Sequence, residues 1–220
     1  PQTMAMKYSI ETPNCSGINH ADFSIDGRYA IFTCEYGGAV AKVDLVAKKV
    51  LGYLKLSKGG MPQDVRVSPD GKVFYVADMK AAGVFIVDGD NFVELGHIKT
   101  GLGTHGLYPS RDGTKLYVAN RGVARVYGPP KGKGSVSVID FATRKVTETW
   151  PIPGGGSPDM GNVSIDGKQL WPSGRYDNEV YVFDTASGGI KKIPVKSEPH
   201  GLTVWPQPGR YSLGHTGNLR

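Results

Sequence analysis

The sequence feature that most constrains the fold is a repeat of some forty-odd residues. A short turn of the form Ser-x-Asp-Gly occurs four times, with its aspartate at Asp26, Asp70, Asp112 and Asp166, at intervals of 44, 42 and 54 residues. A second aspartate that closes an apolar strand recurs at Asp44, Asp88, Asp140 and Asp184. Such a period is typical of stacked supersecondary units, and the long third interval in both series predicts an inserted loop over residues 121–134.

Each repeat unit is predicted to contain four β-strands. In the second unit these cover residues 64–68, 72–78, 83–88 and 92–100, which are rich in Val, Ile, Phe and Tyr and bounded by Gly, Pro or Asp. Four strands in about 43 residues is the pattern of a propeller blade, which buries its faces only against its neighbours. The 31 glycines and 15 prolines among 220 residues also argue against long helices. We therefore expect an all-β propeller of four-stranded antiparallel blades, forming a single domain over residues 1–220.

Five units are visible, and they begin near residues 19, 63, 105, 159 and 199. The fifth offers only two strands, around residues 201–204 and 211–215. Residues 6–11 resemble the outermost strand of a blade, so the two ends of the chain could combine into one hybrid blade. Such a blade would close a ring of five, whereas the alternative is that the chain is part of a seven-bladed parent, which we favour.

Two segments at equivalent places of the repeat carry a family resemblance. Residues 116–120, Leu-Tyr-Val-Ala-Asn, and residues 74–78, Phe-Tyr-Val-Ala-Asp, follow the Ser-x-Asp-Gly turns and resemble the YVTN repeats of bacterial and archaeal β-propellers. The resemblance covers nearly the whole chain and implies the propeller fold. It leaves the function open, because similar propellers include surface and envelope proteins, streptogramin lyase-like enzymes and the d1-haem domains of nitrite reductase relatives.

Polar residues occur where the innermost strand of each unit begins. They are His20, Asp64, His105, Asp159 and His200. A propeller brings such residues to one mouth of its central channel, where they could ligate a divalent metal or transfer protons in a lyase or hydrolase. A haem with an axial histidine is a further alternative, and a polar lining for a water-filled channel is the simplest one. His20 and Asp64 precede the turn serine by four residues but His105 and Asp159 by five, so the set need not form one ring.

A second set of candidate residues is basic and aromatic. It comprises Arg121, Arg125, Tyr127, Lys131 and Lys133 in the inserted loop, and Arg175 and Tyr176 in the corresponding loop of the next unit. With the net charge of +6, this set predicts a platform for a protein, a polymer or an anionic ligand. Single-stranded nucleic acid is a weaker candidate. The alternative is a loop whose charges only keep it solvated. Binding is the favoured function, and whether the chain is an enzyme stays open.

Cys15 and Cys34 are the only two cysteines, and the predicted topology places both on one face of the first blade. A disulfide between them would close a loop of about twenty residues and favour an extracytoplasmic location, in the periplasm, on the cell surface or outside the cell. Two independent thiols are the alternative. No stretch approaches the roughly eighteen apolar residues of a membrane span. Trp150, Trp171 and Trp205 are expected to pack between blades.

Overall fold

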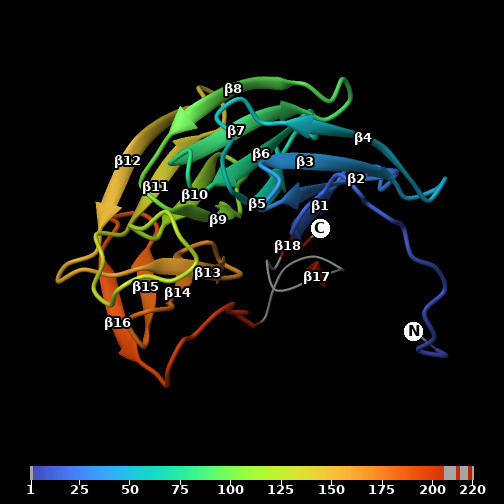
Figure 1. Cartoon of the computed structure of the whole chain (residues 1–220). Coiled ribbons are helices and arrows are strands. Elements are labelled where there is room, and N and C mark those ends of the chain that lie inside the picture. Colours follow the sequence, from blue (N-terminus) through green and yellow to red (C-terminus); the bar gives the residue numbers. More distant parts are fainter. Residues whose placement is uncertain (1, 206–211, 214–217, 220) are drawn as a thin grey trace.

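The chain folds as an arc of four blades, each a sheet of four antiparallel strands (Figure 1). The computed structural model describes residues 2–205, 212–213 and 218–219, and no helix occurs among them. Within each blade the strands follow one another from the inside of the arc to the outside in the order of the sequence. The predicted all-β architecture of four-stranded antiparallel propeller blades is confirmed.

The sixteen blade strands have similar lengths. Blade 1 contains β1 (Ile18–Phe23), β2 (Tyr29–Cys34), β3 (Ala39–Asp44) and β4 (Lys49–Lys55). Blade 2 contains β5 (Pro62–Val67), β6 (Val73–Asp78), β7 (Gly83–Asp88) and β8 (Glu94–Lys99). Blade 3 contains β9 (Thr104–Pro109), β10 (Lys115–Asn120), β11 (Ser135–Asp140) and β12 (Lys145–Pro151). Blade 4 contains β13 (Pro158–Val163), β14 (Gln169–Gly174), β15 (Glu179–Asp184) and β16 (Ile190–Pro194).

The Ser-x-Asp-Gly motif closes the hairpin between the first and second strands of each blade. In blade 2 the Ser68 hydroxyl donates to Asp70 Oδ1 at 2.5 Å, and the same oxygen accepts the amide of Lys72 at 3.2 Å. The hydrogen bond from Ser68 lowers the pKa of Asp70. Gly71 has a φ of 75°, which glycine adopts without strain. The serine and aspartate of the other three turns form the same bond, so the sequence repeat is a repeat of one hairpin.

The second repeated aspartate shapes the hairpin between the third and fourth strands. Asp88 Oδ1 accepts the amides of Asp90 at 3.0 Å and Asn91 at 2.8 Å. Asp44, Asp140 and Asp184 likewise accept the amide three residues ahead. An aspartate that bonds its own backbone in this way favours a turn over a continued strand.

Most of the apolar core lies between neighbouring blades. Phe74 and Phe85 of blade 2 pack with Ile31 of blade 1, and a comparable cluster joins blades 2 and 3. Between blades 3 and 4, the rings of Trp150 and Phe183 stack with their centroids 5.9 Å apart. Each blade is therefore held mainly by the blades beside it, as expected for repeated units that cannot bury their faces alone.

The prediction that all three tryptophans pack between blades is wrong for Trp205, which is 85% exposed. It lies in coil that follows β16 and so has no blade to pack against. Trp171 is half-buried on β14, and its indole nitrogen donates to Gln169 Oε1 at 3.0 Å.

The two predicted strands of the hybrid blade that fall on described residues are absent. Residues 6–11 are coil, with Met6 87% exposed, and residues 201–204 are coil as well. Each of the four blades takes all its strands from its own repeat, so residues 6–11 have no sheet to join. The fifth repeat is therefore not seen as a blade in the described residues, which include only part of the segment predicted at 211–215. In the part of the chain that the structure describes, the short strands β17 (Ser212–Leu213) and β18 (Asn218–Leu219) pair with each other and with no blade.

A disulfide joins Cys15 and Cys34 at the first blade. It packs with Ala39 and Ala41 on the face of blade 1 that is turned away from blade 2. The bond ties the N-terminal segment to the end of β2. Within the described residues there is no helix long and apolar enough to cross a membrane.

A β-bulge interrupts the innermost strand of every blade at the same place. The register shifts between Ile18 and Ala21 in β1, and at the matching points of β5, β9 and β13. At each bulge, two residues of the inner strand lie opposite one residue of the second strand. This changes the direction in which the two side chains point. The residues so displaced are 19–20, 63–64, 105–106 and 159–160, and they include four of the five predicted polar site residues.

Candidate functional site

Asp64 is the centre of a buried cluster between blades 1 and 2. Its Oδ1 lies 2.6 Å from Arg66 Nη1 and 3.4 Å from Nδ1 of His20, and all three side chains are buried. Its Oδ2 accepts the amide of Leu107 at 2.9 Å. Burial by itself would raise the pKa of Asp64, but Arg66, His20 and the Leu107 amide together hold that pKa below its ordinary value. Asp64 is therefore a paired, ionised carboxylate.

Asp159 is the centre of a second cluster of the same composition, between blades 3 and 4. Its Oδ1 lies 3.1 Å from Nδ1 of His105, and its Oδ2 lies 2.6 Å from Nη2 of Arg121, which follows β10. Burial, reinforced by Arg121 and other nearby cations, lowers the pKa of His105 well below its usual range. His105 is therefore neutral at pH 7, whereas Arg121 carries the charge that balances Asp159.

The two clusters touch through their imidazoles. The rings of His20 and His105 meet edge to face, with centroids 6.1 Å apart. His200 is half exposed, and its Nε2 lies 3.9 Å from Asp159 Oδ2. The site therefore consists of two His-Asp-Arg clusters in contact. The division follows from the bulges, because His20 and Asp64 are the second displaced residue of their strands, whereas His105 and Asp159 are the first.

Both carboxylates of the predicted metal site already face a guanidinium. Among the described residues, no group of three or more His, Cys, Asp or Glu side chains is placed to hold a metal ion. A divalent metal bound by His20, Asp64, His105, Asp159 and His200 would have to compete with Arg66 and Arg121 for the two carboxylates. The metal site stays a prediction.

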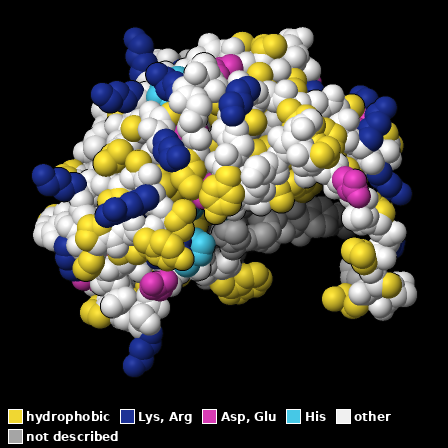
Figure 2. All heavy atoms as spheres, viewed as in Figure 1, with side chains coloured by type: hydrophobic (Ala, Val, Ile, Leu, Met, Phe, Trp, Pro, Cys, Tyr) yellow, Lys and Arg dark blue, Asp and Glu magenta, His cyan; other side chains and the backbone are white. Residues whose placement is uncertain are grey.

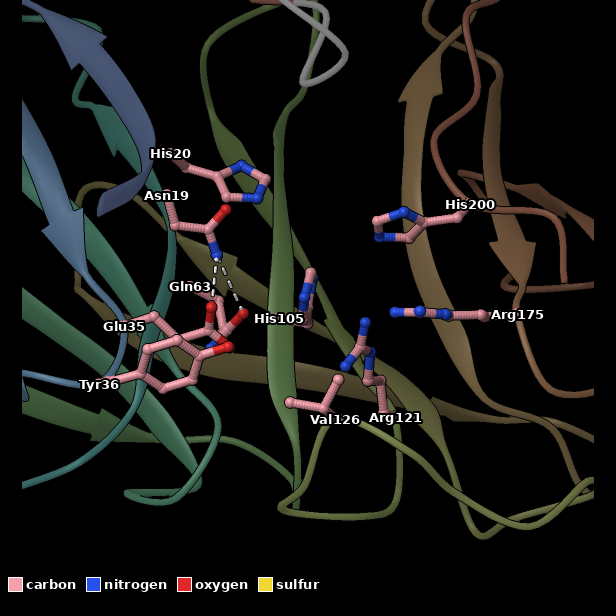
Figure 3. Close-up of a pocket in the computed structure, with 10 residues that line it drawn as sticks. All are labelled: Asn19, His20, Glu35, Tyr36, Gln63, His105, Arg121, Val126, Arg175 and His200. Carbon is pink, nitrogen blue, oxygen red and sulfur yellow. Dashed lines mark hydrogen bonds between the residues drawn. The ribbon is translucent and has the colours of Figure 1, made fainter. Parts of the chain in front are cut away.

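A cavity of about 190 Å³ opens where the two clusters meet (Figure 3). The lining residues come from all four blades, the inserted loop and the coil after blade 4. They are Asn19, His20, Glu35, Tyr36, Gln63, His105, Arg121, Val126, Arg175 and His200. Figure 3 shows Arg175 and His200 reaching in from one side and Asn19, Glu35, Tyr36 and Gln63 from the other.

Of the predicted basic and aromatic residues, the cavity gathers Arg121 and Arg175, with Tyr176 beside them. The guanidinium carbons of Arg121 and Arg175 lie 5.9 Å and 5.7 Å from the centre of the Tyr176 ring, within cation–π range. The Tyr176 hydroxyl donates to the carbonyl oxygen of Val126. Tyr176 therefore connects the inserted loop to the arginine side of the cavity.

The remaining residues of that predicted set lie apart from the cavity. Arg125 and Tyr127 are exposed on the inserted loop, whereas Lys131 and Lys133 line a separate groove with Gly154. Lys131 also pairs with Glu179, at 2.7 Å. In Figure 2 the Lys and Arg side chains are spread over the face in view and do not form one patch. The loop residues thus divide between two places, because the path of an insertion is not set by the period of the repeat.

Asn19, Glu35 and Gln63 also line the cavity but are outside the two sets of candidate residues predicted from the sequence. Asn19 and Gln63 each occupy the first position of a bulge, beside His20 and Asp64, so their equivalent places in the repeat were a usable signal. Glu35 directly follows β2, the place that Arg121 takes after β10 and Arg175 after β14, so its position in the repeat was also a usable signal although its charge is opposite. Its place beside Asn19 and Gln63 depends on how blades 1 and 2 pack.

Residues 38–209 match the family of YNCE-like β-propellers. The chain belongs to this family. The propeller relationship expected from the repeats is thereby confirmed. A curated relative of this YNCE-like chain is Antigen Lp49 of Leptospira interrogans serogroup Icterohaemorrhagiae serovar copenhageni (strain Fiocruz L1-130). The two are 24% identical over 187 residues, an alignment that covers 72% of this chain and 37% of the antigen.

Solved structures give the same fold. Kuenenia stuttgartiensis hydrazine synthase superposes with a TM-score of 0.70 and 26% identity, over 88% of this chain and 54% of that one. Streptogramin B lyase superposes with a TM-score of 0.70 and 14% identity, over 87% and 60% of the two chains. A putative 6-phosphogluconolactonase from Bacteroides uniformis ATCC 8492 gives 0.63 and 19%, over 82% and 56%. The YNCE-like chain thus spans little more than a third of the antigen and between 54% and 60% of these structures.

Proposed function

We propose that this YNCE-like chain is a binding protein whose cavity takes the anionic group, a carboxylate or a phosphate, of a small ligand. The observation that carries the proposal is Arg175. Its side chain points into the cavity, it makes no ion pair with a described residue, and its Nε is buried without a hydrogen-bond partner (Figure 3). The guanidinium therefore lacks a counter-charge among the described residues, and a ligand carboxylate or phosphate in the cavity would supply that charge and hydrogen-bond acceptors.

The other basic side chains explain why Arg175 would act on the ligand. The charges of Arg66 and Arg121 are balanced by Asp64 and Asp159, and His105 is neutral. Among the described residues, Arg175 is thus the cation on the blade 4 side of the cavity that has no carboxylate partner. A guanidinium presents two parallel N–H groups that match the two oxygens of a carboxylate or phosphate. The volume of about 190 Å³ equals roughly six water molecules, which fits a small ligand or the end of a larger one.

The wider role as a binding protein has support from outside the cavity. The fold is shared with proteins of unrelated activities, and one relative is named an antigen, which fits interaction better than one conserved reaction. Arg125 and Tyr127 on the exposed loop are available to a protein or polymer that carries the anionic group. An extracytoplasmic location is part of the proposal, because disulfides such as Cys15–Cys34 persist in oxidising compartments.

The proposal is tested by calorimetric titration with phosphate, acetate and succinate. We expect Arg175→Gln to weaken binding of the best of these anions at least about tenfold, since a hydrogen bond to a charged group contributes about 1.5–3 kcal/mol. Arg28→Gln, which removes an equal charge from an exposed residue outside the cavity, should leave the affinity unchanged. Equal affinities of wild type and Arg175→Gln, or no binding of any probe at millimolar concentration, would overturn the proposal.

The metal-dependent lyase or hydrolase and the haem protein are alternatives for the same residues. We place them second because Arg66 and Arg121 occupy the carboxylates that a metal would need. Elemental analysis of protein purified without added metal tests the first alternative. A visible absorption spectrum tests the second.

A further inference from the structure

The wall of the cavity opposite Arg175 presents oxygen atoms. Asn19 Nδ2 donates to Glu35 Oε2 at 3.3 Å and to Gln63 Oε1 at 3.5 Å. Gln63 Nε2 donates to Glu35 Oε1 at 3.2 Å and to the carbonyl oxygen of Met61 at 3.1 Å. A side-chain amide nitrogen has two hydrogens, so both amides use their donors inside this network. What the wall offers a ligand is therefore hydrogen-bond acceptors.

This wall also carries the negative charge of Glu35, which no residue in the described part of the chain balances by an ion pair. The two Glu35 oxygens accept hydrogen bonds from neutral amides, whereas Asp64 and Asp159 each have a guanidinium at 2.6 Å. Glu35 makes no ion pair with any residue that the structure describes. A carboxylate whose hydrogen bonds come from neutral amides still lacks a counter-charge and favours a cationic donor, such as an ammonium group.

Tyr36 adds an aromatic surface to the same wall. Its side chain lines the cavity and is 66% exposed. The ring lies against the backbone of Gly17, where any larger side chain would collide with it, so the backbone supports the ring. An aromatic face next to a carboxylate is a common setting for an ammonium group.

Positive and negative groups thus lie at opposite ends of one small cavity (Figure 3). We infer that the cavity binds a zwitterion of amino-acid size, with its carboxylate at Arg175 and its ammonium group at Glu35, Asn19 and Gln63. This inference rests on the proposed function, because it uses Arg175 as the carboxylate site. It adds the chemical class of the ligand, which anion binding alone leaves open. A hydroxy acid would offer donors to the wall but no charge to balance Glu35.

The test compares probes that differ only in the ammonium group. We would titrate the ω-amino acids from glycine to 6-aminohexanoate and, for each, the unsubstituted alkanoate with the same number of carbons. The series is needed because the chain length must match the separation of the two charged ends. We expect the best amino acid to bind about tenfold more tightly than its alkanoate.

Variants test whether the preference for the amino acid over the alkanoate comes from the wall that contains Glu35. Glu35→Gln should reduce the affinity ratio of amino acid to alkanoate to about one while the alkanoate still binds, and Arg175→Gln should weaken both probes. Glu11→Gln removes an equal charge from an exposed N-terminal residue and should leave the ratio unchanged. Near-ultraviolet circular dichroism checks that each variant is folded.

The possible outcomes distinguish a failure of the zwitterion inference from a failure of the proposed anion binding. A ratio of one for every chain length in the wild type overturns the zwitterion inference and leaves anion binding intact. An unchanged ratio in folded Glu35→Gln also overturns it. If neither alkanoates nor amino acids bind, the zwitterion inference fails, and the proposed function fails with it when phosphate does not bind either.

Discussion

At the scale of single residues, the centre of the molecule combines buried charged groups that have ion-pair partners with two partly buried ones that have none among the described residues. Asp64 and Asp159 each hold one arginine and one histidine, which makes them structural groups first. Arg175 and Glu35 have no ion-pair partner among the described residues, and they are the groups we assign to a ligand. The distinction rests on contacts between blades, which decide whether a charged side chain is already satisfied.

Neutral His105 predicts a pH dependence of stability. Burial lowers the pKa of His105 in the folded state. Below about pH 6.5 this imidazole is therefore protonated in the unfolded chain but still neutral in the folded chain. The contribution of neutral His105 to the free energy of unfolding is complete above that pH. It decreases as the pH falls toward the pKa of the folded state, by up to about 1.4 kcal/mol per pH unit. Urea unfolding at pH 7.5 and 5.5 measures this loss, in a range where carboxylates stay ionised.

The variant His105→Gln isolates that contribution. His97 and His200 also have pKa values lowered by burial, so the variant should retain part of the loss. A loss between pH 7.5 and 5.5 that is as large in His105→Gln as in the wild type would contradict the assignment to His105.

At the scale of strands and turns, the repeat in the sequence predicted the blades well, because one hairpin with one set of side-chain bonds recurs in every unit. The bulges were not predicted, since a register shift in β1 or β5 depends on pairing with the next strand. The bulges determine which neighbouring side chains each of the two displaced residues in an inner strand contacts. Of the five residues predicted at the channel mouth, His20 and Asp64 lie in one cluster and His105 and Asp159 in another, which agrees with their different distances from the turn serine. Glu35 was not predicted.

The disulfide predicts how the first blade depends on redox conditions. It joins residues separated by 19 positions, and closing a loop of about this size restricts the unfolded chain by about 3 kcal/mol. We expect a reducing agent to lower the free energy of unfolding by about that amount. Urea unfolding with and without dithiothreitol measures it. The double variant Cys15→Ala/Cys34→Ala should show no response to dithiothreitol, and an equal response would contradict the prediction.

At the scale of the whole molecule, stability is expected to be shared between neighbouring blades, because the main apolar clusters lie at their boundaries. Phe74 is buried in the cluster that joins blades 1 and 2. Phe74→Ala should cost about 3–5 kcal/mol and should speed amide hydrogen exchange in these two blades more than in blade 4.

The matching change at the other end of the arc is Trp150→Ala, which removes the ring that stacks on Phe183. It should speed exchange mainly in blades 3 and 4. Hydrogen exchange followed by mass spectrometry of peptic fragments distinguishes the two patterns. A uniform rise over all four blades in both variants would show that the arc unfolds as one unit.

The bulge in each inner strand has a consequence for how such a protein can change its ligand. Of the displaced residues, Asn19 and Gln63 line the cavity without belonging to either His-Asp-Arg cluster. New chemistry can therefore be introduced at positions 19 and 63 while Arg66 and Arg121 keep their carboxylates and the scaffold stays unaltered.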